Sequence, residues 1–345
     1  MEPAEIVELK SKIATGGEFY ANIQQLGGPV ESGLKGSNNE YAYPVVNGIL
    51  LMLKDVAIPW QSTLPVSGLL DTNKQWVRDF YDQKGWLADH DGNYNDAVIY
   101  EDLRAVSADY IKKCHVRVGR YIHPQGKYLL DAASGSIQYP EYLAYSRNYE
   151  YHICADFSFQ ALTEAKKKLG AKGIYILCDI TQLPIKKNTV DSFISLHTIY
   201  HIPKDQQAKA IRELYRVLRP GGKGVVVYDW FKHSPWMNTW LFPFRAFVFA
   251  KNRVLRTVRK LTSTKLGAGR LYFYAHTLEY FRKTLPPFQL RVWRSVSVPF
   301  LRYYIHPWLF GKQILDKVYE KEEQSPEECG RKGEYPMLVF EKEDP

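Results

Sequence analysis

Polar residues close four successive apolar segments in the middle of the chain, and this pattern limits the fold more than any other feature. From residue 127 onward, short apolar segments alternate with segments of helical spacing, which favours a parallel sheet flanked by helices. The expected strands end at Asp131, Asp156, Asp179 and His197. Because ligands of such sheets bind beyond the carboxyl ends of the strands, we expect these side chains to share one crevice.

The same alternation sets the expected elements and domains. Seven strands are expected at residues 127–131, 151–156, 174–179, 190–196, 224–229, 291–298 and 335–341. Residues 1–70 are expected to form an N-terminal appendage, with a hairpin at 41–53 that turns at Asn47-Gly48. Residues 71–345 are expected to form the main domain, starting with a mainly helical stretch to residue 113 and interrupted by insertions at about 231–278 and 299–333.

The residue types at the strand ends suit a nucleoside. The small residues of Asp131-Ala-Ala-Ser-Gly135 permit a tight turn through which backbone can approach a ligand. Asp156 can accept hydrogen bonds from both hydroxyls of a ribose, and Asp179 can accept one from an adenine amine. Carboxylates fit these roles because a buried donor left unpaired costs about 1–3 kcal/mol.

Four sequence blocks resemble the class I methyltransferases that use S-adenosylmethionine, especially the methyltransferase type 11 branch with the ubiquinone and menaquinone C-methyltransferases. The blocks are LLDAASGS, CADFS, CDITQLPIKKNTVDSFISLHTIYHI and ELYRVLRPGGKGVVVYD. The resemblance implies an α/β fold, a Rossmann-like sheet of seven strands with the last one antiparallel, and S-adenosylmethionine as cofactor. It also implies transfer of a methyl group as the activity.

By this resemblance, Asp131 and Gly135 lie near the methionine part of the cofactor, Asp156 at the ribose and Asp179 at the adenine. Tyr81 resembles a tyrosine that folds over the cofactor, and His197 lies where the loop after the fourth strand faces the sulfonium. The other expected cofactor contacts are Ala133, Ser134, Phe157 and Ile180.

One departure from the family pattern concerns the glycines of the first motif. The usual pattern is acidic-x-Gly-x-Gly-x-Gly, whereas Ala133 and Ile137 occupy the two outer glycine positions here. The departure leaves open a weaker affinity for the cofactor. A cofactor-binding scaffold without catalytic activity is therefore kept as an alternative.

The candidate catalytic residues follow the fourth strand. His197, His201 and Tyr200 could remove a proton from the acceptor or orient it, although packing against the next helix is an equal explanation for the last two. No Asn/Asp-Pro-Pro-aromatic motif follows that strand, and Cys154 and Cys178 fall within expected strands. We therefore expect a small-molecule or lipid-like acceptor, methylated at oxygen or carbon. RNA is the alternative acceptor, and nucleic acid is not the expected partner.

The excess positive charge is local. Residues 230–278 contain nine Lys and Arg residues and no Asp or Glu, which matches the net charge of +9 of the whole chain. A basic amphipathic segment suits an anionic membrane surface or an anionic lipid-like substrate, and a solvated face over a core helix is an equal alternative. The aromatic residues of the second insertion could complete the same pocket or serve only as packing.

The number and spacing of the cysteines indicate the cellular compartment and whether a metal site is expected. Four cysteines occur without close spacing, and no signal peptide or apolar segment long enough for a membrane span is recognisable. We expect a cytoplasmic protein with at most peripheral membrane contact. The hairpin at 41–53 also resembles the end of a zinc-ribbon-like segment fused ahead of some methyltransferases, but the cysteine pairs of that segment are missing. No metal is expected.

Overall fold

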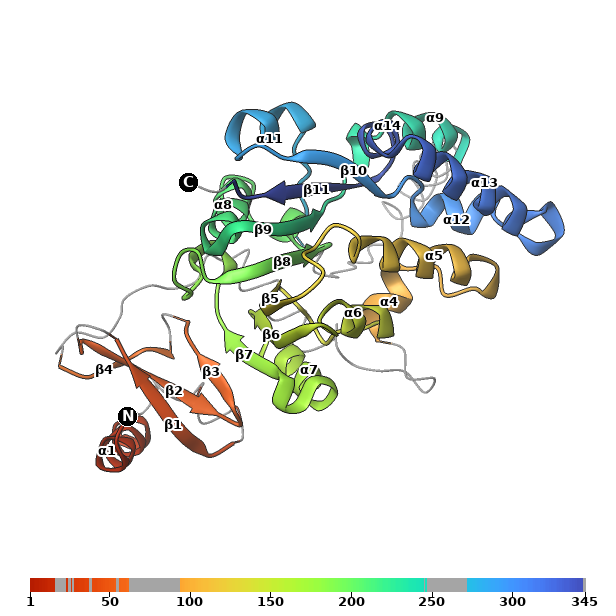
Figure 1. Cartoon of the computed structure of the whole chain (residues 1–345). Helices are drawn as coiled ribbons and strands as arrows, with labels where there is room; N and C mark the ends of the chain where they lie inside the picture. The colour runs from red at the N-terminus through yellow and green to blue at the C-terminus, as the bar shows by residue number, and fades with distance from the viewer. Residues whose placement is uncertain are drawn as a thin grey trace, which may run out of the picture.

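A computed structural model describes residues 1–15, 23, 26, 28–36, 39–53, 56–61, 94–244, 246 and 272–343. Within these residues the strands form one sheet of eleven strands (Figure 1), with the order β1-β2-β3-β7-β6-β5-β8-β9-β11-β10 and β4 paired to β2. The N-terminal strands are β1 (Val30–Lys35), β2 (Tyr41–Val46), β3 (Ile49–Leu51) and β4 (Ile58–Pro59). The later strands are β5 (Gly126–Ala132), β6 (Tyr149–Asp156), β7 (Gly173–Leu177), β8 (Val190–Leu196), β9 (Leu218–Val227), β10 (Gln289–Arg294) and β11 (Tyr335–Glu341).

The helices connect and cover these strands. The longer ones are α1 (Pro3–Thr15), α5 (Ala105–Val118), α7 (Phe159–Leu169), α8 (Gln207–Val217) and α13 (Gly311–Gln324). The shorter ones are α4 (Asn95–Tyr100), α6 (Pro140–Tyr145), α9 (Pro235–Trp240), α11 (Leu278–Thr284), α12 (Val298–Tyr304) and α14 (Pro326–Lys332). Single turns of 3₁₀ helix occur at η4 (Gly170–Lys172), η5 (Ile180–Gln182), η6 (Ile199–His201), η7 (Phe231–His233) and η8 (Pro307–Leu309).

The central strands have the expected Rossmann-like arrangement. β7, β6, β5, β8 and β9 pair in parallel, in that order. β11 pairs antiparallel with both β9 and β10. The carboxyl ends of β5 to β9 therefore meet at one edge of the sheet, where the chain order reverses between β5 and β8.

The N-terminal strands extend the same sheet. β2 and β3 form the expected hairpin around Asn47-Gly48, both at positive φ. β3 then pairs in parallel with β7, from Ile49 opposite Tyr175 to Leu51 opposite Leu177. The expected domain boundary near residue 70 lies outside the described residues.

Alternate side chains of the central strands pack into two layers of core. Leu130 of β5 lies in a cluster with residues of α8, including Ile211 and Leu214. Its neighbour Leu129 lies in the opposite cluster, with Ile111 of α5. Successive residues of a strand point to opposite faces, so helices cover both faces of the sheet (Figure 1).

One expected strand is shorter than the sequence suggested. The strand expected at residues 291–298 ends at Arg294, and α12 begins at Val298. The side-chain oxygen of Ser297 accepts a hydrogen bond from the Phe300 amide (3.3 Å), and Pro299 occupies the first turn. This N-cap and the proline favour a helix start over a longer strand.

A buried ion pair holds the helical layer to the sheet. Glu322 of α13 and Arg117 of α5 are 1% and 2% exposed, and Arg117 Nη1 lies 3.0 Å from Glu322 Oε2. Glu322 Oε1 also accepts hydrogen bonds from the Tyr110 hydroxyl (2.6 Å) and from the amide and hydroxyl of Ser295 (2.7 and 2.6 Å). Arg117 Nη1 donates to the Trp293 carbonyl of β10 (2.6 Å). Both charges are thus paired and hydrogen-bonded, as buried charges must be.

Glu322→Ala should lower the free energy of unfolding by about 3–5 kcal/mol, because it removes the buried carboxylate that pairs with Arg117 and leaves the Tyr110 hydroxyl and Ser295 without their acceptor. The partly exposed Glu323, 3.0 Å from Arg117 Nε, remains as the second carboxylate partner of Arg117. Chemical denaturation followed by circular dichroism measures the change. Glu320→Ala, on an exposed position of the same helix, is the control and should change stability by less than about 0.5 kcal/mol. A loss below about 1 kcal/mol for Glu322→Ala would show that this pair does not hold the layer.

Candidate cofactor and acceptor site

The turn after β5 has a left-handed backbone at every position where the family pattern has glycine. The φ angles are +57° at Ala133, +56° at Gly135 and +53° at Ile137. Positive φ is unfavourable for alanine and more so for a β-branched residue such as isoleucine. Ile137 is only 1% exposed and packs with apolar residues such as Leu162 of α7, so burial offsets the strain. The turn therefore keeps the family's backbone path although two of its glycines are replaced.

Contacts from the next strand and helix hold this turn. Asp156, at the end of β6, accepts a hydrogen bond from the Gly135 amide at Oδ2 (2.8 Å). Its Oδ1 accepts from the amides of Phe157 and Ser158 (2.7 and 2.8 Å). Lys168 Nζ of α7 donates to the carbonyl groups of Ser136 and Ile137 (2.8 and 2.7 Å). The carboxylate of Asp156 is thereby fixed beside the turn after β5.

Asp131 near the end of β5 and Asp179 after β7, the strands on either side of β6, have different surroundings. Asp131 is 2% exposed, and its Oδ2 lies 3.4 Å from Nε2 of the buried His152. Asp179 is half-buried, and its Oδ1 accepts from the amide and hydroxyl of Thr181 (both 2.8 Å) at the start of η5. Asp179 and Asp156 follow the paired strands β7 and β6, so both carboxylates lie at the same sheet edge. Ile180, the next residue, is buried in the core.

The residues that were expected to act in catalysis separate into two groups. His197 has φ of +59°, and its ring packs edge-on against Trp293 (4.3 Å between ring centroids) and Tyr335 (5.5 Å). Tyr200 lies in the core on the α8 side, with its ring near those of Tyr228 and Phe273 (5.8 and 5.1 Å). His197 is thus the candidate that contacts the residues of β10 and β11.

Both histidines are neutral at physiological pH. Burial, together with the charge of Arg294, holds the pKa of His197 well below its usual value. Burial lowers the pKa of His201 to about 4. Nδ1 of His201 lies 2.7 Å from the Tyr272 carbonyl, which can only accept, so this nitrogen carries the proton. The chain from residue 272 therefore fixes the orientation of His201.

Asp229 is a further candidate site residue, which the sequence did not single out. It lies two residues beyond the end of β9, and it is 8% exposed. Its Oδ1 accepts from the Phe231 amide (2.7 Å), yet burial raises its pKa to about 7. The signal was present, since the expected strand at 224–229 ends in an aspartate as three earlier strands do.

Arg294 is a buried positive charge whose field lowers the pKa of this carboxyl and so opposes the effect of burial. It is 1% exposed, and its Nη1 lies 2.6 Å from Glu101 Oε1. Its guanidinium lies over the rings of Trp293 and Tyr335, 4.8 Å from each centroid. Burial, together with the negative charge of Asp229, raises the pKa of Tyr335. We call His197, Asp229, Trp293, Arg294 and Tyr335 the strand-end cluster.

Two expected features cannot be placed. Tyr81 and the segment around it lie outside the described residues, as do residues 247–271 of the basic segment.

Cys154 and Cys178 are buried, and burial raises the pKa of both thiols, which agrees with core positions. In the described part of the chain, no helix is long and apolar enough to cross a membrane.

Comparison with known proteins identifies the class of this domain. Residues 130–226, from β5 to β9, match the family model described as a methyltransferase domain. Together with the fold, this match shows a class I methyltransferase domain, and S-adenosylmethionine is the cofactor of that class.

Curated relatives match parts of the chain. The ubiquinone/menaquinone biosynthesis C-methyltransferase UbiE of Desulfotalea psychrophila is 33% identical over 95 residues, which is 27% of this chain and 36% of that protein. A human protein named probable tRNA methyltransferase 9B is 27% identical over 135 residues, which is 38% of this chain and 28% of that protein. The chain thus spans about a third of the length of these relatives. Because relatives of both kinds occur, the expectation that nucleic acid is not the acceptor is not supported.

Among solved structures, a geranyl diphosphate methyltransferase aligns with 79% of this chain and 100% of its own, with 14% identity and a TM-score of 0.45. The [4+2]-cyclase SpnF aligns with 81% of this chain and 98% of its own, with 15% identity and a TM-score of 0.44. Likeness at this level does not bear on function.

The hydrogen-bonding groups at the sheet edge fit the cofactor. The carboxylates of Asp156 and Asp179 can accept from ribose hydroxyls and from an adenine amine, because they follow adjacent strands. The left-handed turn at Ala133 to Ile137 brings backbone to the same edge. The Ser136 hydroxyl, inside this turn, is fully buried without a hydrogen-bond partner in the described part of the chain.

Ala133→Gly should raise the free energy of unfolding by up to about 1 kcal/mol, because glycine removes the left-handed strain that alanine bears there. Chemical denaturation measures the change. Ala132→Gly is the matched control, since Ala132 is buried at the end of β5 and does not have positive φ; it should lower stability. An equal loss in both variants would show that strain at Ala133 is negligible.

Proposed function

We propose that the chain transfers the methyl group of S-adenosylmethionine to a small-molecule or lipid-like acceptor, at oxygen or carbon, beside the strand-end cluster. The observation that carries this proposal is that Asp229 and His197 both lie at the start of β11. The amides that flank Asp229, those of Tyr228 and Trp230, donate to the carbonyls of Pro336 and Glu334 (3.0 and 2.8 Å), and the His197 ring lies 5.5 Å from that of Tyr335. Burial raises the pKa of Asp229 to about 7 and lowers the pKa of His197. The main-chain hydrogen bond from His197 to the Val227 carbonyl (3.3 Å) joins the ends of β8 and β9. Asp156 and Asp179 close strands further along the same edge.

The proposed roles of the cofactor contacts follow from their positions. Asp156 holds the ribose hydroxyls, and Asp179 with Ile180 holds the adenine. The turn from Asp131 to Gly135 lies under the methionine part, and the expected contacts Ala133, Ser134 and Phe157 belong to the same two loops. The bound cofactor supplies an electrophilic methyl carbon on a positively charged sulfur, and the residues of the chain align the acceptor with it.

Asp229 is proposed as the group that takes the proton from the acceptor. A general base works best when its pKa is close to the pH at which the enzyme operates. The carboxylate form of Asp229 would accept the proton of an O–H or acidic C–H group of the acceptor. The cofactor would supply the methyl group and leave as a neutral thioether, which takes the electrons of the broken carbon–sulfur bond. His197 orients the acceptor, and packing against the Trp293 ring holds the imidazole in place. Arg294 stabilises negative charge that develops on the acceptor.

The cluster favours an acceptor of limited size. Trp293 and Arg294 are almost fully buried, and β10, β11 and α4 enclose them through Tyr335 and Glu101. A buried aromatic cluster with a few polar groups is typical of small-molecule sites.

RNA remains the second candidate, because curated relatives are named as tRNA methyltransferases and because the chain has a net charge of +9. Incubation of the protein with methyl-labelled S-adenosylmethionine and a cell extract separates the two. The small-molecule acceptor is supported if the label is extracted by organic solvent and is not released by nuclease. Label in nuclease-sensitive RNA contradicts it.

Cofactor binding tests the assignment of the ribose. Asp156→Ala should weaken binding of S-adenosylmethionine at least about tenfold, because the hydroxyl donors lose a charged acceptor. Isothermal titration calorimetry measures the affinity. The control is Glu164→Ala on α7, which should leave the affinity unchanged. Within the described residues, the Glu164 carboxylate pairs only with side chains of its own helix. Undiminished binding in Asp156→Ala contradicts the ribose assignment.

The pH dependence tests the role of Asp229. Asp229→Asn should lower the rate of methyl transfer about 10²–10⁴-fold. In the wild type, the rate should rise with pH up to about 7 and then level off, because the carboxyl must lose its proton to act as a base. The labelled-methyl assay at a series of pH values measures both effects. A variant with the wild-type rate and pH profile excludes Asp229 as the base.

A stability measurement shows whether the same variant is folded. The folded-state pKa of Asp229 lies above its usual value of 3.8, so the wild type loses stability as pH rises from about 4 through about 7. Asp229→Asn does not acquire that buried charge. It should therefore be at least as stable as the wild type at pH 8, which separates lost catalysis from lost folding.

A further inference from the structure

Exposed large apolar side chains gather on one part of the described surface. α9 and the residues after it expose Trp240 (59%) and Phe242 (70%). The segment from α12 to α13 exposes Tyr303 (49%), Trp308 (74%), Leu309 (43%) and Phe310 (71%). We call these six residues the aromatic face. Soluble proteins rarely expose such a group without a function for it.

Direct contacts place these elements side by side. The Tyr304 hydroxyl of α12 donates to the Trp240 carbonyl of α9 (2.7 Å), and the rings of Phe244 and Tyr303 are 3.8 Å apart. Trp308 follows α12 by four residues and stacks on His306 (5.4 Å between ring centroids). Figure 1 shows α9, α12 and α13 on the same side of the sheet. The aromatic face is therefore one surface.

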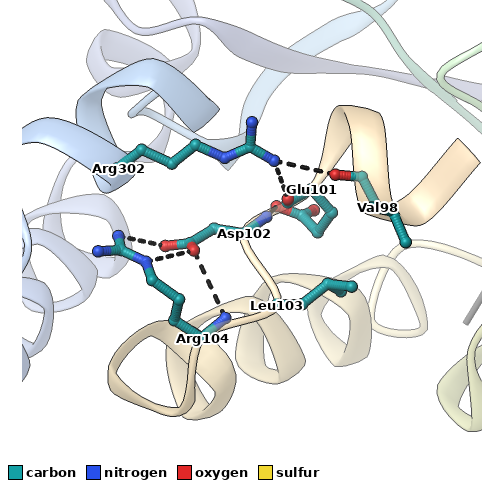
Figure 2. A pocket seen from close by; sticks show the side chains of 6 residues that line it. All are labelled: Val98, Glu101, Asp102, Leu103, Arg104 and Arg302. Carbon is teal, nitrogen blue, oxygen red and sulfur yellow. Dashed lines mark hydrogen bonds and ion pairs between the residues drawn. The ribbon is translucent and has the colours of Figure 1, made fainter. Parts of the chain in front are cut away.

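The helix α4 extends this surface. Arg302 of α12 donates to the carbonyls of Val98 and Glu101 (3.2 and 2.7 Å) and so fixes the end of α4 (Figure 2). A shallow depression between the two helices is lined by Val98 and Leu103 together with polar residues. Val98 and Leu103 are themselves 42% and 46% exposed.

Packing does not explain the tip of the surface. Trp308, Leu309 and Phe310 are consecutive, and all three are exposed. Phe310 also has φ of +56°, an unfavourable conformation for a large side chain, where it precedes α13. A strained backbone that presents an aromatic ring to solvent indicates that the ring is used there.

We propose that the aromatic face docks on an anionic lipid bilayer. Trp and Tyr are amphipathic and favour the boundary between headgroups and acyl chains. Charge supplies the second argument, because Lys232 of η7, which precedes α9, and Lys312 in the first turn of α13 are exposed and positively charged. In the sequence, the segment from Trp230 to Leu278 has nine basic residues and no acidic one, and Lys232 is the one of the nine that lies within the described residues.

Sedimentation with vesicles tests the proposal and needs no substrate or cofactor. The full chain should sediment with vesicles of phosphatidylglycerol and phosphatidylcholine, and at least about tenfold less with phosphatidylcholine alone. The double variant Trp308→Ser, Phe310→Asn should lower the partition coefficient for anionic vesicles by roughly tenfold or more. Both positions are exposed and asparagine tolerates positive φ, so this variant should fold.

The control is Leu34→Ser with Val116→Ser, two exposed apolar positions on β1 and α5 outside the aromatic face, 50% and 49% exposed. It should bind vesicles as the wild type does, and both variants should bind S-adenosylmethionine equally. The proposal is overturned if the wild type does not sediment, if it binds neutral vesicles equally well, or if the double variant binds like the wild type. A wild-type dimer in solution that the double variant abolishes would assign the face to a second copy of the chain instead.

Discussion

Two opposite charges in the interior, Arg117 and Glu322, tie the helical layer to the sheet. A buried charge is stable only with an opposite charge and hydrogen bonds around it, and the contacts of this pair fix three elements at once: α5, α13 and β10. The consequence reaches the functional edge, because Arg117 binds the carbonyl of Trp293 and the ring of that residue packs against His197. The site depends on the packing of helices that contribute no residue to the strand ends.

The sequence allowed most of the central sheet to be predicted, because each parallel strand is a short apolar segment followed by a polar residue and a helix. The bounds of β8 and β11 agree with the expected ranges. The strand expected at 291–298 was too long, since apolar residues continue into α12 and only the Ser297 cap marks the change. The pairing of β3 with β7 could not be predicted, because a three-residue strand shows too little alternation to identify its neighbour.

The site was predictable in part. Carboxylates at the ends of adjacent parallel strands must lie at one edge, and the structure has Asp156 and Asp179 there. Sequence spacing could not show that the side chains of Tyr200 and His197 point to different places. His197 has a left-handed backbone that turns the chain, so its ring faces β10 while Tyr200 enters the core. The contribution of Arg294 and Tyr335 was equally hidden, because they lie 97 and 138 residues after His197 in the chain. That distance in sequence is closed only by the antiparallel pairing of β11 with β9.

The turn after β5 keeps a glycine-like backbone conformation although most of its key residues are not glycine. Its backbone angles match a pattern of three glycines although only Gly135 is a glycine. The geometry survives because hydrogen bonds from Asp156 and Lys168 enclose the loop and because Ile137 is anchored in the core. A sequence pattern that demands all three glycines would therefore overlook this chain. In this loop, the surrounding contacts can enforce a torsion angle that the residue type alone would disfavour.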